Sequence, residues 1–406
     1  MYLKRLFPLV FIFTTYSIKA DEPNLKLKIY GFIRNDFYYN SRKNEESTDG
    51  TFSYFPKPIE LNAGVDKNDV ATAEMISVNS RIGLDVSGTN VLNAKSTAKL
   101  EADFAGFSTS YYVLRIRQAY TKLNWETTEL LIGQTWHPLF GNVSPTVLSL
   151  NTGSPFQPFN RSPQVRFNVN INKQFSLTGA AIYEMQFLSN GPIGASASYM
   201  KNAIIPNLFL GSEYKTSHWI SGLGIDFKTI KPDIYQISSA NAVLYTQYSD
   251  SKFQLKGKAI LGENLSDQAM IGGYGVSKFS TDSTTAKEYT NFNTFTSWIN
   301  IVYGSKIQVG IFAGISQNLG TNKTLDLRKG NKLTAYGCGY YDNTQILIDQ
   351  LFRVSPHINY SLPNFKIGIE YELSSAKYGV IQQNGRVKNP YSINNNRIVA
   401  VMSYIF

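Results

Sequence analysis

Six arginines stand at positions from which their guanidinium groups could bind anions. Each lies in a segment where polar and apolar residues alternate, and each has an apolar residue beside it, as Ile33 precedes Arg34. Such neighbours point to opposite faces of an extended strand, so the arginines share the polar faces. A guanidinium stays charged at any usable pH, and its planar fork matches a carboxylate or a phosphate. The six are Arg34, Arg81, Arg115, Arg117, Arg166 and Arg353.

Two roles are open to these arginines. Gathered beside a water-filled path, they would attract anions and repel cations. They could instead pair with acidic residues of the same polar faces and brace a wall. The candidate acidic partners are Asp36, Asp85, Asp103, Glu370 and Glu372. The pattern leaves both roles open.

Other reactive residue types do not form a recognisable catalytic or metal-binding motif. The histidines His137, His218 and His357 are far apart, and none forms the paired spacing of a zinc site. No G-x-S-x-G motif is present, and Cys338 is the single cysteine. The acidic segment 66–74 lacks the glycine and the ligand spacing of an EF-hand. We therefore expect no enzymatic activity, no cofactor and no metal.

The elements that would position the arginines are strands. Segments of period two recur along the chain, and their number, sixteen, is even, as in bacterial transmembrane barrels. The connections between them alternate between long and short, which is also typical of such barrels. The predicted strands are 25–38, 74–87, 94–106, 110–122, 128–136, 163–171, 173–186, 206–215, 217–229, 236–248, 252–263, 291–303, 305–317, 348–360, 364–374 and 395–406. The long connections are 39–73, 137–162, 187–205, 264–290, 318–347 and 375–394.

The first twenty residues have the order of a secretory signal peptide. Lys4 and Arg5 precede an apolar run over 6–13, and Ala20 closes the segment. Residues 21–406 contain no apolar run long enough for a spanning helix. Only helices and closed barrels satisfy the backbone within lipid. We therefore predict a signal peptide over 1–20 and a single all-β transmembrane barrel over 21–406.

The segment 394–406 supports this fold class. Its apolar residues occupy every second position, on one face of a strand, and the last two of them are Tyr404 and Phe406. It resembles the closing strand of bacterial outer-membrane barrels, in which a terminal phenylalanine is the assembly signal. That resemblance implies that Tyr404 and Phe406 are read by the barrel-assembly machinery. The 26 tyrosines and 25 phenylalanines also suit aromatic girdles at two membrane interfaces.

Two further segments resemble the DcaP-like porins. One is Ile29–Arg42, and the other is Leu114–Trp136, which carries an R-x-R-x-A-Y strand followed by a G-Q-T-W strand. The matching positions are Arg115, Arg117, Ala119, Tyr120, Gly133, Gln134 and Trp136. The resemblance implies a homotrimer of sixteen-stranded barrels that favours anionic solutes such as carboxylates.

The connection 137–162 is the third connection on its side of the barrel if the strands run as predicted. It is rich in proline, and Arg161 is its one formal charge. A loop that leaves bulk water is penalised for unpaired charge, so this segment suits a loop folded into the lumen. The alternative is an ordinary external loop packed on its own side chains. The residues expected to form a constriction are His137, Phe140, Phe156, Phe159 and Arg161.

These observations predict an outer-membrane porin for passive diffusion of small hydrophilic solutes, with both termini in the periplasm. At sixteen strands an aqueous channel remains inside a barrel. Loss of residues 1–20 would remove Lys4, Arg5 and Lys19 and lower the formal charge from +10 to +7, which favours an anion-selective pore. The expected partners are solutes, outer-membrane lipid and lipopolysaccharide, but no nucleic acid. A substrate-specific uptake channel and a structural or adhesive surface barrel remain alternatives.

Overall fold

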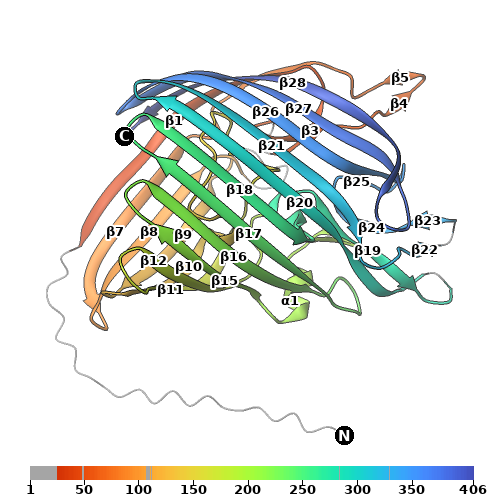
Figure 1. Ribbon diagram of the computed structural model, residues 1–406, viewed down its shortest axis with the longest axis horizontal. Helices are drawn as coiled ribbons and strands as arrows, with labels where there is room; N and C mark the ends of the chain where they lie inside the picture. The colour runs from red at the N-terminus through yellow and green to blue at the C-terminus, as the bar shows by residue number, and fades with distance from the viewer. Residues whose placement is uncertain (1–24, 48–49, 107–109, 111, 283, 329) are drawn as a thin grey trace, which may run out of the picture.

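A computed structural model of the chain describes residues 25–47, 50–106, 110, 112–282, 284–328 and 330–406. The predicted signal peptide, 1–20, lies outside these residues. Within them, the chain forms a closed antiparallel β-barrel of 16 strands, as predicted (Figure 1). The wall consists of β1 (Lys26–Asn40), β6 (Thr72–Ile76), β7 (Arg81–Val91), β8 (Ala94–Asp103), β9 (Arg115–Asn124), β10 (Thr128–Trp136), β11 (Arg161–Asn170), β12 (Phe175–Ile182), β15 (Asn207–Lys215), β16 (Trp219–Ile230), β17 (Ile237–Ser249), β18 (Phe253–Glu263), β20 (Ala286–Gly304), β21 (Ile307–Thr321), β26 (Ile346–Leu362), β27 (Phe365–Ile381) and β28 (Val387–Ile405).

The first and last wall strands close the barrel. β1 pairs with β28 from Phe32↔Ile405 to Asn40↔Arg397. β6 and β7 pair one after the other with β1, so together they act as one interrupted strand. The predicted strand 128–136 coincides with β10, whereas the strand predicted at 110–122 begins at Arg115.

The connections hold short elements. They are β2 (Asn44–Ser47), β3 (Phe52–Pro56), β4 (Leu61–Asn62), β5 (Val65–Asp66), η1 (Pro138–Phe140), β13 (Asn190–Gly191), β14 (Gly194–Ala195), α1 (Ser198–Ala203), η2 (Ser266–Gln268), β19 (Gly272–Phe279), β22 (Leu327–Arg328), β23 (Lys332–Leu333), β24 (Ala335–Cys338) and β25 (Tyr340–Tyr341). In the part of the chain that the structure describes, no helix is long and apolar enough to cross a membrane.

The wall separates an apolar outer face from a polar inner face. On β1, Ile33 is 56% exposed while Asp36 is fully buried, and on β28 Met402 is 46% exposed while Arg397 is fully buried. This is the alternation expected when hydrocarbon covers one face of a barrel and the other face lines its interior.

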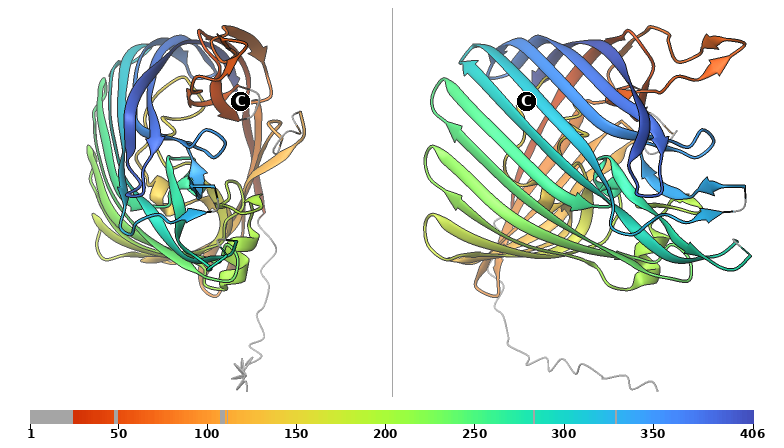
Figure 2. Two further views of the ribbon diagram at one scale, coloured as in Figure 1. Left: turned by 90° about the vertical axis from the view of Figure 1, so that its right-hand side faces the viewer. Right: turned by 45° about the vertical axis from the view of Figure 1, so that its right-hand side comes forward.

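Most short connections lie at one end of the barrel, called the turn end below. The longer ones lie at the opposite, loop end, together with the short connections 231–236 and 382–386. The start of β1 and the end of β28 lie at the turn end (Figures 1 and 2). The predicted long connection 375–394 is wrong, because β27 continues to Ile381 and β28 begins at Val387. These strand ends carry polar residues on both faces. Apolar and polar residues therefore do not alternate there, and the pattern from which the other strands were predicted is missing.

Strand length differs around the wall. β7 to β12 have 8 to 11 residues, whereas β20, β26, β27 and β28 have 17 to 19. The barrel is consequently low on one side and tall on the other, as Figure 2 shows.

Candidate functional site

Three of the predicted arginines meet on the inner face of the low side. Arg115 forms two hydrogen bonds with the Asp103 carboxylate, at 2.9 and 2.8 Å. Arg117 donates to Glu101 at 3.0 Å and to Asp103 at 2.6 Å. Arg81 lies 3.6 Å from Glu101. We call these five residues the arginine ladder.

An irregularity in β9 shapes this ladder. Glu101 is paired with Gln118 and Ala102 with Ile116, so Arg117 is the extra residue of a β-bulge. Arg117 and Gln118 consequently both face inward. Before the bulge the odd-numbered residues of β9 face inward, and after it the even-numbered residues do. Tyr120 and Lys122 therefore join the inner face.

The other three arginines also face inward but do not join the ladder. Arg34 forms an ion pair with Asp36 at 2.6 Å. Arg166 donates to the Gln164 side chain at 2.9 Å. Arg353 is 1% exposed and donates to the Ser374 hydroxyl and to main-chain carbonyls of two loops. Their roles in lining a pore stay predictions.

The connection 137–160 is held by inward-facing side chains from strands around the barrel. Leu139, Val143 and Phe156 are buried in one cluster with Phe209, Tyr245, Trp298 and Phe312 of the wall. The hydrogen bonds between wall and loop include those of Lys258 to the Phe140 carbonyl, Lys256 to the Thr146 hydroxyl at 2.7 Å, Asn300 with both main-chain groups of Thr146 at 2.8 and 3.3 Å, Arg34 to the Leu148 carbonyl at 2.7 Å, Glu370 from the Leu148 N–H, Arg353 to the Ser154 carbonyl at 2.9 Å, and Trp298 to the Gln157 side chain at 3.0 Å.

His137 fixes the start of this loop. Its Nδ1 accepts the Leu139 N–H at 3.2 Å, and its Nε2 lies 3.0 Å from the Asn207 side-chain amide. A neutral ring that accepts at Nδ1 carries its proton on Nε2, which lies 3.0 Å from Asn207 Nδ2 and 3.7 Å from Asp226 Oδ1. Complete burial lowers the pKa of His137 to about 3 because the charged ring would lose its hydration. His137 is therefore a neutral structural residue.

Aromatic rings stand beside the ladder, and Arg161 lies among them. Trp136 stacks on Phe140 with ring centres 4.2 Å apart and meets Phe159 edge-on at 4.8 Å. The Arg161 guanidinium lies 4.7 Å from the Trp136 ring centre, and among the described residues its Nε and Nη1 have no hydrogen-bond partner. Arg161 is 1% exposed, so the rings cover a cation that pairs with no carboxylate of the described part of the chain.

The first long connection also reaches inward-facing residues, which the sequence did not predict. Arg353 donates to the Tyr54 carbonyl at 2.8 Å, Arg397 to the Gly50 carbonyl at 2.8 Å, and Tyr378 to the Pro56 carbonyl at 2.6 Å. The aromatic run F-S-Y-F-P at 52–56 is the available signal, because Phe52 and Phe55 are buried there.

Three cavities follow one another from the loop end towards the turn end. The first has a volume of about 500 Å³ and is lined by loop residues such as Tyr54, Phe187 and Cys338. The second, about 130 Å³, shares Arg115 and Phe187 with the first. The third, about 740 Å³, shares Trp136 with the second. The small middle cavity is lined by Arg81, Arg115, Arg117 and Asp103 from the wall and by Leu150, Thr152 and Phe159 from the connection 137–160.

Other candidate chemistry is not assembled. Among the residues that the structure describes, no group of three or more His, Cys, Asp and Glu side chains could hold a metal ion. The predicted assembly residues Tyr404 and Phe406 lie on the outer face at 55% and 52% exposure, and Phe406 exchanges two main-chain hydrogen bonds with Gly31.

No family model matches the sequence, and neither does any curated protein sequence. The fold is similar to that of the outer membrane channel DcaP of Acinetobacter baumannii, with a TM-score of 0.67, 16% identity, and coverage of 94% of this chain and 97% of that one. It is also similar to an anion-selective porin from Comamonas acidovorans, with a TM-score of 0.55, 9% identity, and coverage of 94% and 100%. A third similar structure is the trimer form of Vibrio cholerae OmpT, with a TM-score of 0.53, 9% identity, and coverage of 94% of this chain and 99% of that one. The chain therefore has the sixteen-stranded barrel fold of porins, DcaP among them.

Proposed function

We propose that this protein is an outer-membrane porin through which small hydrophilic solutes diffuse passively. The observation that carries the proposal is the row of three cavities inside a closed barrel whose outer face is apolar. In this proposal the connection 137–160 folds into the lumen and forms one side of the smallest of the three compartments. His137, Phe140, Phe156, Phe159 and Arg161 shape that constriction loop, and the arginine ladder forms the opposite side.

The proposed channel favours anions such as carboxylates. Three guanidinium groups, of Arg81, Arg115 and Arg117, meet two carboxylates, of Glu101 and Asp103, in the ladder. The excess positive charge lies in the smallest cavity, where little water screens it. Arg161 adds a further cation close to the same compartment. Ion pairing and anion selection are thus compatible roles of the same arginines.

The proposed assembly is a homotrimer that uses the low side of the barrel. None of the outward side chains of β7, β8, β9 and β10 is aromatic. Elsewhere, aromatic rings stand exposed beside the turn end, as a membrane interface requires. They include Phe175, Trp219, Tyr303 and Tyr360 at 47%, 46%, 56% and 41% exposure. The outer face of β7 to β10, here the aromatic-free face, instead carries small residues such as Ala98 and Ala119, which suit close packing between barrels.

The proposed orientation places the turn end and both chain termini in the periplasm. Short periplasmic turns and longer external loops are the rule for outer-membrane barrels. In this orientation residues 1–20 direct export, and Tyr404 and Phe406 are the signal read by the barrel-assembly machinery.

A planar-bilayer experiment tests the channel and its selectivity together. Purified protein reconstituted in a tenfold potassium chloride gradient should give a reversal potential of the sign that marks chloride preference. A liposome-swelling series with sugars, amino acids and dicarboxylates should show rates that do not saturate with concentration. Absence of conductance would refute the porin proposal, a cation preference would refute its selectivity, and saturable flux would indicate a substrate-specific channel instead.

A further inference from the structure

The first of the three cavities, called the outer vestibule below, differs from the other two in its charges. It has a volume of about 500 Å³ and lies at the loop end, where a solute would enter in the proposed orientation. Among its described lining residues, Glu45 in β2 and Arg115 in β9 are the charged ones, and the remainder are uncharged. One carboxylate and one guanidinium therefore share a compartment with four aromatic rings. The rings belong to Tyr54, Phe187, Tyr340 and Tyr341.

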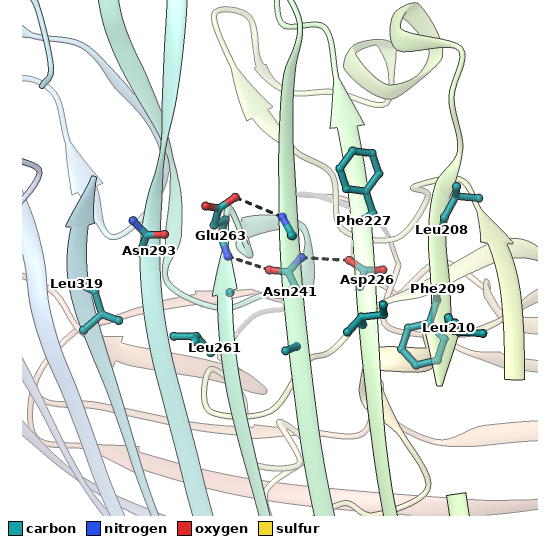
Figure 3. A pocket seen from close by; sticks show the side chains of 14 residues that line it. Leu208, Phe209, Leu210, Asp226, Phe227, Asn241, Leu261, Glu263, Asn293 and Leu319 are labelled. Carbon is teal, nitrogen blue, oxygen red and sulfur yellow. Dashed lines mark hydrogen bonds between the residues drawn. The ribbon is translucent and has the colours of Figure 1, made fainter. Parts of the chain in front are cut away.

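The connection after β18 closes the vestibule from inside the barrel. β18 ends at Glu263, and Figure 3 shows the hydrogen bonds from Glu263 to Asn241 and from Asn241 to Asp226 that join the wall strands there. The chain then turns into the lumen and forms a main-chain hydrogen bond with the constriction loop. Ser266 and Ala269, both buried, line the vestibule from this segment. The vestibule is therefore bounded by packed chain on its inner side.

Arg115 offers a place for a carboxylate at the inner end of the vestibule. Its Nε and Nη2 donate to Asp103 at 2.9 and 2.8 Å. A guanidinium has five N–H donors, so the edge formed by Nη1 and the second hydrogen of Nη2 can still bind a carboxylate through two parallel bonds. The Arg115 side chain is 20% exposed and lines both the vestibule and the middle cavity. An anionic group bound there would stand at the entrance to the arginine ladder.

Glu45 offers a place for a cation in the same vestibule. Its side chain is 43% exposed, and the Tyr341 hydroxyl lies 3.5 Å from its Oε2. The rings of Tyr54 and Tyr341 line the cavity beside this carboxylate, and aromatic rings attract cations through their negative faces. Lys57 lies 3.9 Å from Glu45, but an exposed pair at that distance contributes little and does not exclude another cation.

We infer that the outer vestibule binds betaines, which are zwitterions that carry a quaternary ammonium group and a carboxylate. The ammonium group lies between Glu45 and the tyrosine rings, and the carboxylate binds Arg115. The inference rests on the proposed channel function and deepens it, because a preference for anions does not by itself select a solute without net charge.

The lining favours a methylated ammonium over a primary one. A primary ammonium has three N–H donors, and each of them needs an acceptor when it leaves water. Glu45 is the one carboxylate among the described lining residues, and it already receives the Tyr341 hydroxyl. A quaternary ammonium group donates no hydrogen bond, and aromatic rings are its usual partners. A betaine therefore leaves fewer polar groups unpaired than an amino acid would.

Saturation-transfer NMR on the full-length protein in deuterated detergent tests the site. The probe is 4-(trimethylammonio)butanoate, whose methyl protons give one sharp signal. Its isostere 5,5-dimethylhexanoate has the same shape and carboxylate but no cation. Wild type should bind the probe about fivefold more tightly than the isostere, which corresponds to one cation–ring contact. Tetramethylammonium, which lacks the carboxylate, should also bind more weakly than the probe.

Variants separate the two ends of the site. Glu45→Gln should weaken binding of the probe about fivefold and leave binding of the isostere unchanged. Glu60→Gln is the matched control, because Glu60 is a half-exposed glutamate of the same connection that pairs with Lys67 at 2.6 Å and does not line the vestibule. Tyr341→Leu, which removes a ring, should weaken the probe, whereas Tyr341→Phe, which keeps the ring, should not.

Equal affinities of wild type for the probe and the isostere would overturn the inference, as would equal losses in Glu45→Gln and Glu60→Gln or no binding of the probe. Planar-bilayer conductance of the same preparations separates this result from the channel proposal. A protein that conducts without preferring the probe would lack the betaine site but remain a porin. A protein that binds the probe without conducting would refute the porin proposal instead.

Discussion

Arg34 donates a hydrogen bond from Nη2 to the Leu148 carbonyl at 2.7 Å, so an arginine of the wall holds the loop that crosses towards it. The neighbouring Glu370 accepts the Leu148 N–H. Both main-chain groups of one loop residue are thus hydrogen-bonded by side chains of the wall, so neither is left unpaired where the loop is buried. The position of the constriction loop is therefore set by the barrel as much as by its own sequence.

Loosening this loop should widen the channel. Asn300 binds both main-chain groups of Thr146, and Asn300→Ala removes those bonds at an expected cost of about 1–2 kcal/mol to the docked loop. Single-channel recordings should show a higher mean conductance and more open-channel noise. Thr296→Ala is the matched control, because Thr296 lies on the same inner face but bonds to Ser316 of the neighbouring strand. If both variants behave alike, Asn300 does not control the loop.

Removing the ladder cations should shift the proposed selectivity towards cations. In Arg115→Gln/Arg117→Gln, the carboxylates of Glu101 and Asp103 face Arg81 alone, so the ladder changes from net positive to net negative and only Arg161 nearby offsets it. The reversal potential should move towards cation preference. The opposite variant, Glu101→Gln/Asp103→Asn, should increase anion preference.

The control for the ladder lies in the first long connection. Lys57 and Lys67 are exposed and pair with Glu45 and Glu60 at 3.9 and 2.6 Å. Lys57→Gln/Lys67→Gln removes the same formal charge from a position that water screens. A change in reversal potential as large as that of the arginine variant would contradict the assignment of the ladder to the lumen.

A bulky residue on the aromatic-free face should disrupt the proposed trimer. Ala119 faces outward from β9, where it is paired with the outward Leu100 of β8. Ala119→Trp would hold two barrels apart, and overpacking of a close interface typically costs about 1–3 kcal/mol. Light scattering coupled to size exclusion in detergent should show smaller assemblies. Ala313→Trp, in the sector flanked by aromatic rings, should leave the trimer intact, and the same result for both variants would place the interface elsewhere.

His137 should make the barrel less stable as the pH falls. Its native pKa of about 3 lies below the unfolded value near 6.5, so the unfolded chain binds the extra proton between these values. The stabilisation is complete above pH 6.5 and is lost as the pH falls towards 3. Between pH 7 and pH 5 this group should lower the free energy of unfolding by about 2 kcal/mol.

Guanidinium unfolding in detergent measures this effect. His137→Asn keeps an acceptor for the Leu139 N–H but cannot take up a proton, so its stability should vary less between pH 7 and pH 5 than that of wild type. His218→Asn is the control, because His218 lies exposed in a turn. An unchanged pH dependence in His137→Asn would show that the ring is accessible to protons in the native barrel.

The sequence predicted the wall well because two different solvents act on its faces. Alternation placed β10 at 128–136 and the inner arginines on the correct parity, since lipid on one side and water on the other leave a pattern of period two. The pattern weakens at the loop end of β27 and β28, where the outer face no longer needs to be apolar. A long connection was predicted there, but the strands continue.

The partners within the site were harder to predict than the strands. Asp103 was among the expected partners of the arginines, whereas Glu101 was not. In an uninterrupted register Arg117 would lie opposite Glu101; the bulge in β9 puts Gln118 there instead, and the Arg117 side chain still reaches Glu101 at 3.0 Å. The inward contacts of the segment 52–56 join residues about three hundred positions apart, such as Tyr54 and Arg353. Local periodicity carries no information on such pairs.

The barrel is closed only when β1 pairs with β28, because no other strand pair joins the two ends of the wall. Ser41 and Asn395, 354 positions apart, touch across this seam. Contacts of such sequence separation form slowly, because most of the chain must be ordered before they can be made. A partly built wall would be an open sheet with two bare edges, prone to join another chain. The chain is therefore protected from such joining only once β1 and β28 have paired, because that one step removes both edges.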